Sequence, residues 1–149
     1  MEQLFNNIQK RIADNFPELS LIDEDYGQLE AIETNEDTYP VTFPCVLISI
    51  PEVNWEQLGG PSQRGTASIM IRLAIDCYDD THYGSTTENK AVVRKAFATS
   101  IHRKLQGFRS SANESALIRK KSSDYSRPHG IKVYETMYQC VVNDIVTPH

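Results

Sequence analysis

Residues 66–78, TASIMIRLAIDCY, decide the fold because large apolar side chains recur along them with a period of two. The alternating apolar positions are Ile69, Ile71, Leu73, Ile75 and Cys77. This period predicts a β-strand with one buried face. The run is longer than an ordinary strand, so it can pair with a neighbour on each side. We therefore expect it to be the central strand of a sheet, between the apolar segments 45–50 and 131–143.

The two neighbouring segments differ in pattern. Residues 45–50 are continuously apolar, which is typical of a strand covered on both faces, and Pro51 is expected to end it. Residues 131–143 carry apolar side chains on both faces of the expected strand. One face can be covered by a helix of the same chain, and the other by a second subunit.

Between the first two strands lies the segment 52–65, EVNWEQLGGPSQRG. Its polar composition and its Gly-Gly-Pro run predict a long flexible loop rather than a tight turn. A loop of this length usually makes a contact outside the subunit or is disordered. We expect Trp55 and Leu58 to anchor such a contact, with Trp55 folded back on its own sheet as the alternative.

Two segments have a helical pattern. Residues 2–16 place apolar side chains on a narrow stripe, so they predict an amphipathic helix that ends before Pro17. The second helix is expected to start at Ser85, which has the spacing of a capping box with Glu88, and to end at Gly107. Its core-facing residues are expected to be Val93, Phe97, Ile101, Leu105 and Phe108.

The remaining segments give weaker signals. Residues 19–22 and 26–32 predict a small strand or irregular ribbon, 116–120 a short strand, and 122–130 a loop or open hairpin end. Together the elements predict one α+β domain over residues 1–149. Its core would be an antiparallel sheet of about four to five strands with two main helices packed against it.

The composition excludes several classes of protein. No apolar run is long enough to span a membrane, and the N-terminal residues MEQLFNNIQK lack the pattern of a signal peptide, so we expect a cytosolic chain with no membrane partner. The three cysteines, Cys45, Cys77 and Cys140, are odd in number and lie in apolar strands. They are expected to be core residues without metal or redox roles.

The charges are unevenly distributed. The net charge is −5, which argues against nonspecific nucleic-acid binding. Residues 1–75 contain 4 Lys/Arg and 12 Asp/Glu, whereas residues 76–149 contain 11 and 8, so the halves carry −8 and +3. Opposite signs on one domain suit head-to-tail self-association, although solvated charges with no partner remain the alternative.

No segment requires a catalytic or metal role. His82, His102 and His129 have no spacing that brings two ligands together, so they are expected to be surface residues. The triplet Asp76, Asp79 and Asp80 could hold a divalent metal in a nuclease-like site, but aspartates are also common in turns at strand ends. Similarly, Arg119-Lys120-Lys121 could contact phosphate or be a solvated strand end.

The order of elements resembles the tail terminator and tail-completion proteins of long-tailed bacteriophages. The resemblance spans nearly the whole chain and rests on Phe43-Pro44-Cys45-Val46, on Gln63-Arg64-Gly65 before the central strand, and on the tyrosine-bearing last strand. It implies a non-enzymatic phage or prophage protein without cofactor or metal, located in the virion and, during assembly, in the host cytoplasm. It further implies a ring, usually a hexamer, that caps the tail tube and stops its growth.

The resemblance also implies partners. These are other copies of the chain, the tail tube protein and a head-completion or neck protein, with no specific nucleic acid. The residues expected at interfaces are Trp55, Leu58, Gln63, Arg64, Arg119, Lys120, Lys121, Tyr134 and Tyr138. The alternatives are a metal-dependent nuclease using Asp76, Asp79 and Asp80, or another adaptor of the head–tail neck.

Overall fold

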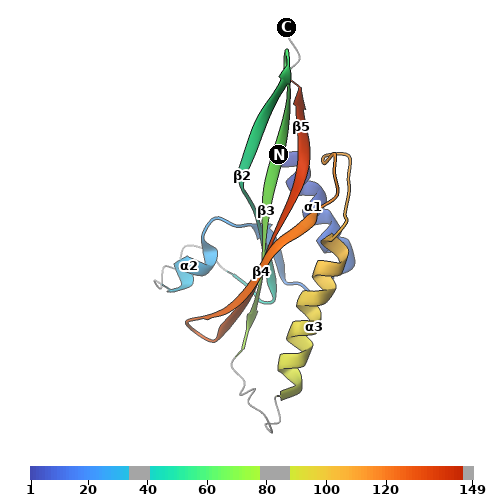
Figure 1. Cartoon of the computed structure of the whole chain (residues 1–149). Coiled ribbons are helices and arrows are strands. Elements are labelled where there is room, and N and C mark those ends of the chain that lie inside the picture. Colours follow the sequence, from blue (N-terminus) through green and yellow to red (C-terminus); the bar gives the residue numbers. More distant parts are fainter. Residues whose placement is uncertain (34–40, 78–87, 146–149) are drawn as a thin grey trace.

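The computed structural model describes residues 1–33, 41–77 and 88–145 (Figure 1). The described helices are α1 (Glu2–Asn15), α2 (Gln28–Glu33) and α3 (Glu88–Leu105). The described strands are β1 (Leu21–Glu24), β2 (Cys45–Gly59), β3 (Ser62–Asp76), β4 (Ile118–Arg127) and β5 (Ile131–Ile145). They form a five-stranded sheet in the order β1-β2-β3-β5-β4.

The expected central strand is confirmed. β3 lies between β2 and β5, and it pairs with β5 along its whole length, from Ser62 opposite Ile145 to Asp76 opposite Ile131. The α+β class is also confirmed, but the sheet is mixed, because β1 runs parallel to β2. Parallel neighbours need a crossover rather than a hairpin. α2 lies in that crossover, so the expectation of an antiparallel sheet throughout was wrong.

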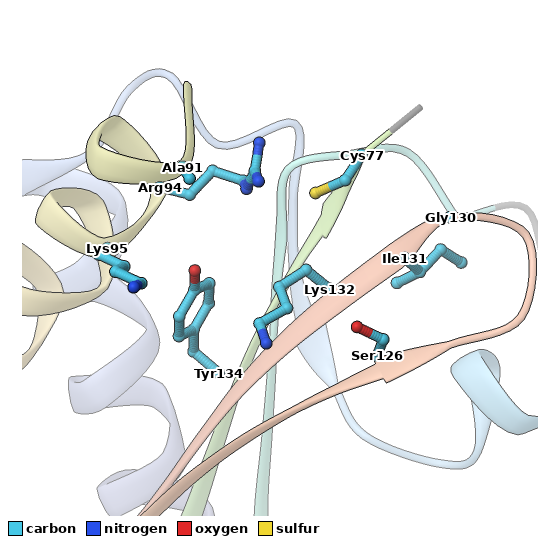
Figure 2. A pocket seen from close by; sticks show the side chains of 9 residues that line it. All are labelled: Cys77, Ala91, Arg94, Lys95, Ser126, Gly130, Ile131, Lys132 and Tyr134. Atoms are coloured by element: carbon cyan, nitrogen blue, oxygen red, sulfur yellow. The ribbon is translucent and has the colours of Figure 1, made fainter. Parts of the chain in front are cut away.

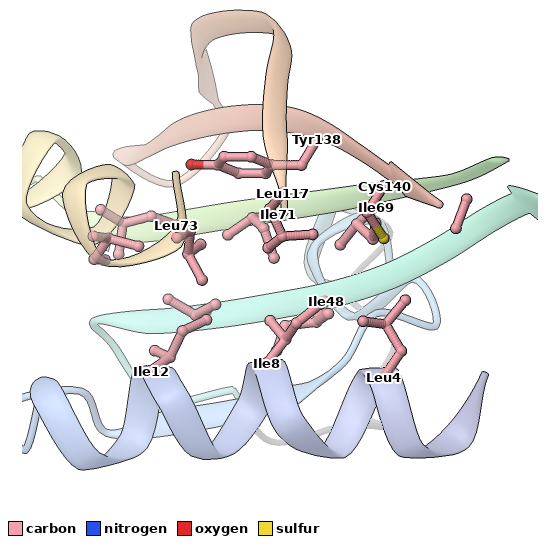
Figure 3. Packing of buried hydrophobic residues seen from close by; sticks show 14 of the residues in the cluster. Leu4, Ile8, Ile12, Ile48, Ile69, Ile71, Leu73, Leu117, Tyr138 and Cys140 are labelled. Atoms are coloured by element: carbon pink, nitrogen blue, oxygen red, sulfur yellow. The ribbon is translucent and has the colours of Figure 1, made fainter. Parts of the chain in front are cut away.

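The main core lies between one face of the sheet and the helices α1 and α3. Figure 3 shows the α1 side chains Leu4, Ile8 and Ile12 pointing at the sheet, as the apolar stripe of residues 2–16 predicted. The sheet contributes alternate residues of its three long strands. These include Val46, Ile48, Ile69, Ile71, Leu73, Tyr138, Cys140 and Val142. The apolar residues that alternate along β3 are therefore those on the face that the helices cover.

A smaller core on the opposite face is built around α2. Leu29 is buried there with residues of β2, β3 and β5. We expected a strand or ribbon over residues 26–32, and this was wrong. Gly27, at φ 98°, turns the chain, and the Gln28 side chain bonds both the Tyr26 N–H and the Glu24 carbonyl, so local hydrogen bonds start a helix.

The segment 52–65 is not a loop. β2 continues to Gly59 and β3 starts at Ser62, with a tight turn between them. Pro51 does not end β2 because it sits in a bulge, between Ser49 and Glu52, where the ladder is interrupted. Gly59 and Gly60 have φ of 131° and 55° and make the turn. The polar composition belongs to a ribbon that faces solvent on both sides.

Two other segments differ from expectation. Residues 122–127 continue β4 and are not a loop, because they pair with β5 as far as Arg127 opposite Ile131. In α3, Ile101 and Leu105 are buried, but Val93 is 64% exposed, so the apolar stripe extends beyond the core. The expected cap at Ser85 lies outside the described residues. Gly107, at φ 81°, follows the end of the helix as expected.

One charged group is buried in the centre of the second face. Arg72 of β3 is 7% exposed, and its guanidinium lies 2.9 Å from both Asp25 Oδ2 and Glu30 Oε1. Arg127 Nη2 contacts the same Glu30 oxygen at 3.0 Å. Partial burial alone would raise the pKa of Glu30, but the hydrogen bond to Arg72 and both positive charges lower it below its usual value. The cluster ties α2 to β3 and β4.

Replacing Arg72 by Ala should lower the free energy of unfolding by about 3–5 kcal/mol, because it leaves the nearly buried Asp25 carboxylate without its partner. Arg64→Ala is the control, since Arg64 lies on the same strand and its ion pair with Glu114 is exposed. That variant should lose less than about 1 kcal/mol. Chemical denaturation measures both, and equal losses would contradict the structural role of the Arg72 cluster.

Candidate interaction surface

The far ends of β2, β3 and β5 project beyond the helices (Figure 1). We call this ribbon the arm, and it comprises residues 52–59, 62–68 and 139–145. β1 covers β2 only as far as Ile48, and β4 covers β5 only as far as Gln139. The arm therefore has sheet neighbours on neither side over most of its length, and an unpaired strand edge is a site for pairing with another chain.

Trp55 is held on one face of the arm. It pairs with Gly65, and a Cβ atom placed on Gly65 would lie 2.8 Å from Trp55 Cζ3 and 2.7 Å from Val53 Cγ1. The indole therefore packs against bare backbone that only glycine offers. It still leaves 43% of the residue exposed. Trp55 is thus partly fixed on its own subunit and partly available to a partner.

The other interface candidates of the arm lie close to Trp55. Leu58, at the end of β2, is 49% exposed. Gln63 is opposite Gln57, and Arg64 is opposite Glu56 and also contacts Glu114 at 3.6 Å. The structure therefore brings Trp55, Leu58, Gln63 and Arg64 together on one ribbon. Glu52 and Glu56, which the sequence reading missed, are exposed on the same strand.

The opposite edge of the sheet is basic. Arg119, Lys120 and Lys121 are exposed at the start of β4, where a bulge at Lys120 interrupts the ladder with β5. Ile118 beside them is 49% exposed. The run that was expected to be a strand end is thus part of an edge strand. Within the described chain, β4 pairs with β5 alone.

A basic cavity of about 460 Å³ lies between α3 and the β4–β5 hairpin (Figure 2). Arg94 and Lys95 of α3 and Lys132 and Tyr134 of β5 line it, and Lys132 also pairs with Asp124 at 2.7 Å. Burial raises the pKa of Tyr134. Tyr134 therefore lies at a basic surface, half buried, and not on the arm.

Tyr138, also expected at an interface, is 1% exposed and belongs to the main core. Its hydroxyl lies 2.7 Å from His102 Nδ1. Burial raises the pKa of Tyr138, and burial together with the charge of Arg119 lowers the pKa of His102. His102 is therefore half-buried and has a defined partner, which the sequence did not predict. It links α3 to β5 through a neutral hydrogen bond.

The candidate metal-binding and catalytic residues lie only partly within the described part of the chain. No group of three or more His, Cys, Asp or Glu among the described residues could hold a metal ion. Asp76 is exposed at the end of β3, while Asp79, Asp80 and His82 lie outside the described residues. The thiols of Cys45 and Cys140 are buried, which raises their pKa to about 12 and about 11. Of the described helices, none is long and apolar enough to cross a membrane.

The chain was compared with protein families, curated proteins and solved structures. No protein-family model matches the chain. No curated protein matches it either. Among solved structures, a chain of the virion of a native gene transfer agent particle is similar, with a TM-score of 0.49 and 9% sequence identity over 92% of this chain and 84% of that chain.

Gly65→Ala should displace the Trp55 ring, because the added methyl group overlaps both the indole and Val53. We expect red-shifted tryptophan emission and a loss of about 1–3 kcal/mol in the free energy of unfolding. Thr66→Ala, on the opposite face of the same strand, is the control and should leave the emission unchanged. Trp55 is the only tryptophan, so its emission reports on the arm alone. Unchanged emission in Gly65→Ala would show that Trp55 does not pack on Gly65.

The His102–Tyr138 pair should make stability depend on pH. Because the folded pKa of His102 lies below its ordinary 6.5, the unfolded chain binds more protons as the pH falls. Stability is therefore complete above about pH 6.5 and decreases as the pH falls toward the folded pKa. Denaturation midpoints between pH 7.5 and 5.5 should show this decrease in the wild type and less of it in His102→Gln. His129→Asn, in an exposed turn, should keep the wild-type slope, and an unchanged slope in His102→Gln would contradict the assignment.

Proposed function

We propose that this chain is a structural component of a phage or prophage virion, a tail terminator that assembles head to tail into a ring. The ring would cap the tail tube, stop its growth and join it to the head, as the resemblance of the sequence implies. The observation that carries the proposal is that the two outer edges of the sheet have opposite charge.

The charge split follows from the strand order. The first half of the chain builds the β1–β2 edge, and the second half builds β5, β4 and α3. Among the described residues, exposed acidic side chains therefore lie on the β1–β2 side of the sheet and exposed basic side chains on the β4–α3 side. The acidic side carries Asp23, Glu24, Glu52 and Glu56, and the basic side carries Arg94, Lys95, Arg119, Lys120 and Lys121.

Opposite edges of this kind favour a heterologous contact. Two acidic edges or two basic edges repel each other, so a two-fold dimer through either edge is disfavoured, whereas unlike edges attract. A head-to-tail contact closes into a ring when its repeated rotation completes a full turn, and otherwise it gives an open filament. Self-association of this type supports a ring-forming virion protein, with six copies as the number that the resemblance implies.

Two further surfaces suit the tube and neck partners. The arm offers Trp55 and Leu58, which are large apolar residues on a projecting ribbon. Val92 and Val93, at 63% and 64% exposure, offer a second apolar surface at the start of α3. Exposed apolar residues grouped in this way mark contact sites. We assign the exposed apolar side chains of the arm and of the start of α3, and not the backbone edge of the arm, to contacts with the neighbouring layers of the particle.

The nuclease alternative gains no support from the described residues. Asp76 is exposed at a strand end and belongs to no metal-binding group among them. The adaptor alternative differs from the tail terminator in its partners and not in its chemistry. Co-assembly with purified tail tubes distinguishes these two, since only a terminator should stop tube growth.

Native mass spectrometry over a range of concentration and salt tests the self-association. We expect oligomers that grow with concentration at low ionic strength and dissociate as salt is added, because exposed charges are screened. A chain that remains a monomer at high concentration and low salt would contradict the proposal.

A further inference from the structure

Hydrogen bonds at the sheet margin show which backbone groups of β2 turn outward. The Asp25 N–H donates to the Ile48 carbonyl, so the Ile48 backbone turns away from β3. The backbone N–H and C=O groups of successive residues in a strand point to opposite sides. After the bulge, Glu52 is opposite Ser68 of β3, and its backbone groups point toward β3. The backbone groups that turn outward in the arm are those of Val53, Trp55 and Gln57. Outside the β2–β3 ladder, none of them has a hydrogen-bond partner among the described residues.

β4 also has backbone groups that point away from the sheet. The Arg119 N–H donates to Gln106 Oε1 instead of β5, so the Arg119 backbone turns outward. Arg119 is opposite Tyr138, an even-numbered residue of β5. The β4 residues opposite the other even-numbered residues of β5, from Thr136 to Lys132, turn their backbone groups outward as well. These residues are Ser122, Asp124 and Ser126. No described residue hydrogen-bonds their outer backbone groups.

We propose that the outer edge of β2 in the arm receives β4 of a second copy as an added antiparallel strand. This inference rests on the proposed function, since it names the contact between neighbours in the ring. Val53, Trp55 and Gln57 of one copy would exchange backbone hydrogen bonds with Ser122, Asp124 and Ser126 of the next. Strand addition at a free edge is a common mode of recognition.

The strand directions agree with this contact. β2 runs toward the tip of the arm, and β4 runs away from it, because each is antiparallel to its neighbour in the series β2-β3-β5-β4. Two copies placed side by side in the same orientation therefore present β2 and β4 to each other as antiparallel strands. This is the arrangement that a head-to-tail ring requires.

The side chains make the pairing selective. Glu52 and Glu56 of β2 lie on the same face of the sheet as Lys121 of β4, since all three are aligned with residues on the Arg72 face. Exposed Leu58 and Ile118 stand at the tip-side ends of the two edges. A bulge and lysines on β4 discourage pairing with itself or with unrelated strands. An acidic edge overcomes that repulsion, so β2 of a second copy is the matching occupant.

Amide hydrogen exchange, resolved by residue, tests the contact in the full-length protein as monomer and as assembly. In the assembly we expect protection to rise at least about tenfold at Val53, Trp55, Gln57, Ser122, Asp124 and Ser126. The amides between them already face a strand and should change little. Assembly without this alternating gain would overturn the edge pairing while leaving self-association intact. A chain that never assembles would overturn both proposals.

A charge swap gives a second test. Glu56→Lys should raise the dissociation constant of the assembly about tenfold, because it replaces an attraction to Lys121 with a repulsion. Combining it with Lys121→Glu in the same chain should restore assembly to within about twofold. Glu18→Lys, an equal change of charge in the exposed turn after α1, is the matched control. An effect of Glu18→Lys equal to that of Glu56→Lys, or no rescue by the double variant, would overturn the pairing.

Discussion

The structure depends on β3 being buried on both faces with different chemistry on each. One face is apolar and receives α1 and α3, while the other carries Arg72. A buried guanidinium needs carboxylate partners, and the partners come from Asp25 and Glu30, with Glu135 Oε1 at 3.7 Å. The segment from β1 to α2 is therefore held on the sheet by a charge as well as by Leu29.

The contribution of the Arg72 cluster to stability depends on pH. Glu30 has a folded pKa below its ordinary 4.5, so its contribution to stability is complete above that value. The contribution is lost as the pH falls through the lowered pKa. The Arg72 cluster therefore loses its contribution to stability at a lower pH than the His102–Tyr138 pair, whose contribution begins to decrease near pH 6.5. The two faces of the sheet respond to acid in separate ranges.

The sequence predicted the elements whose side-chain period is set by the main core. The strand around Ile71 and the helix around Ile8 are examples, because each has one face in a large apolar cluster. It failed where the cause is non-local. The segment 52–65 has few large apolar side chains, so its composition resembles that of a loop, and its strand state comes from the pairing of β2 with β3 and of β3 with β5. Tyr138 was expected at an interface because residues 131–143 carry apolar side chains on both faces, and the periodicity alone does not tell which face the helices cover.

The candidate surface was foreseen only in part. Trp55 and Leu58 were recognised by their size within a polar segment, and Arg119–Lys121 by their charge. The acidic side chains Glu52 and Glu56 gave no signal, since single glutamates are frequent in any exposed segment. Their significance appears only when the strand order places them on the edge opposite Lys121.

The uncovered edge of β2 and the edge strand β4 lie beside different parts of β3. The part of β2 that β1 leaves uncovered lies beside β3 residues 62–70, and β4 lies level with residues 68–76. The midpoints, Thr66 and Arg72, are six residues apart, which is roughly 20 Å along a strand. From the β4 of one copy to the β4 of the next, the proposed contact spans four strands, β2, β3, β5 and β4, or roughly 19 Å. A sheet continued through a ring would therefore incline its strands by roughly 45° to the ring axis, at the upper end of the range of closed barrels. In a closed barrel the shift in strand register is shared among all neighbouring pairs of strands. Here the whole shift would occur where β2 of one copy meets β4 of the next.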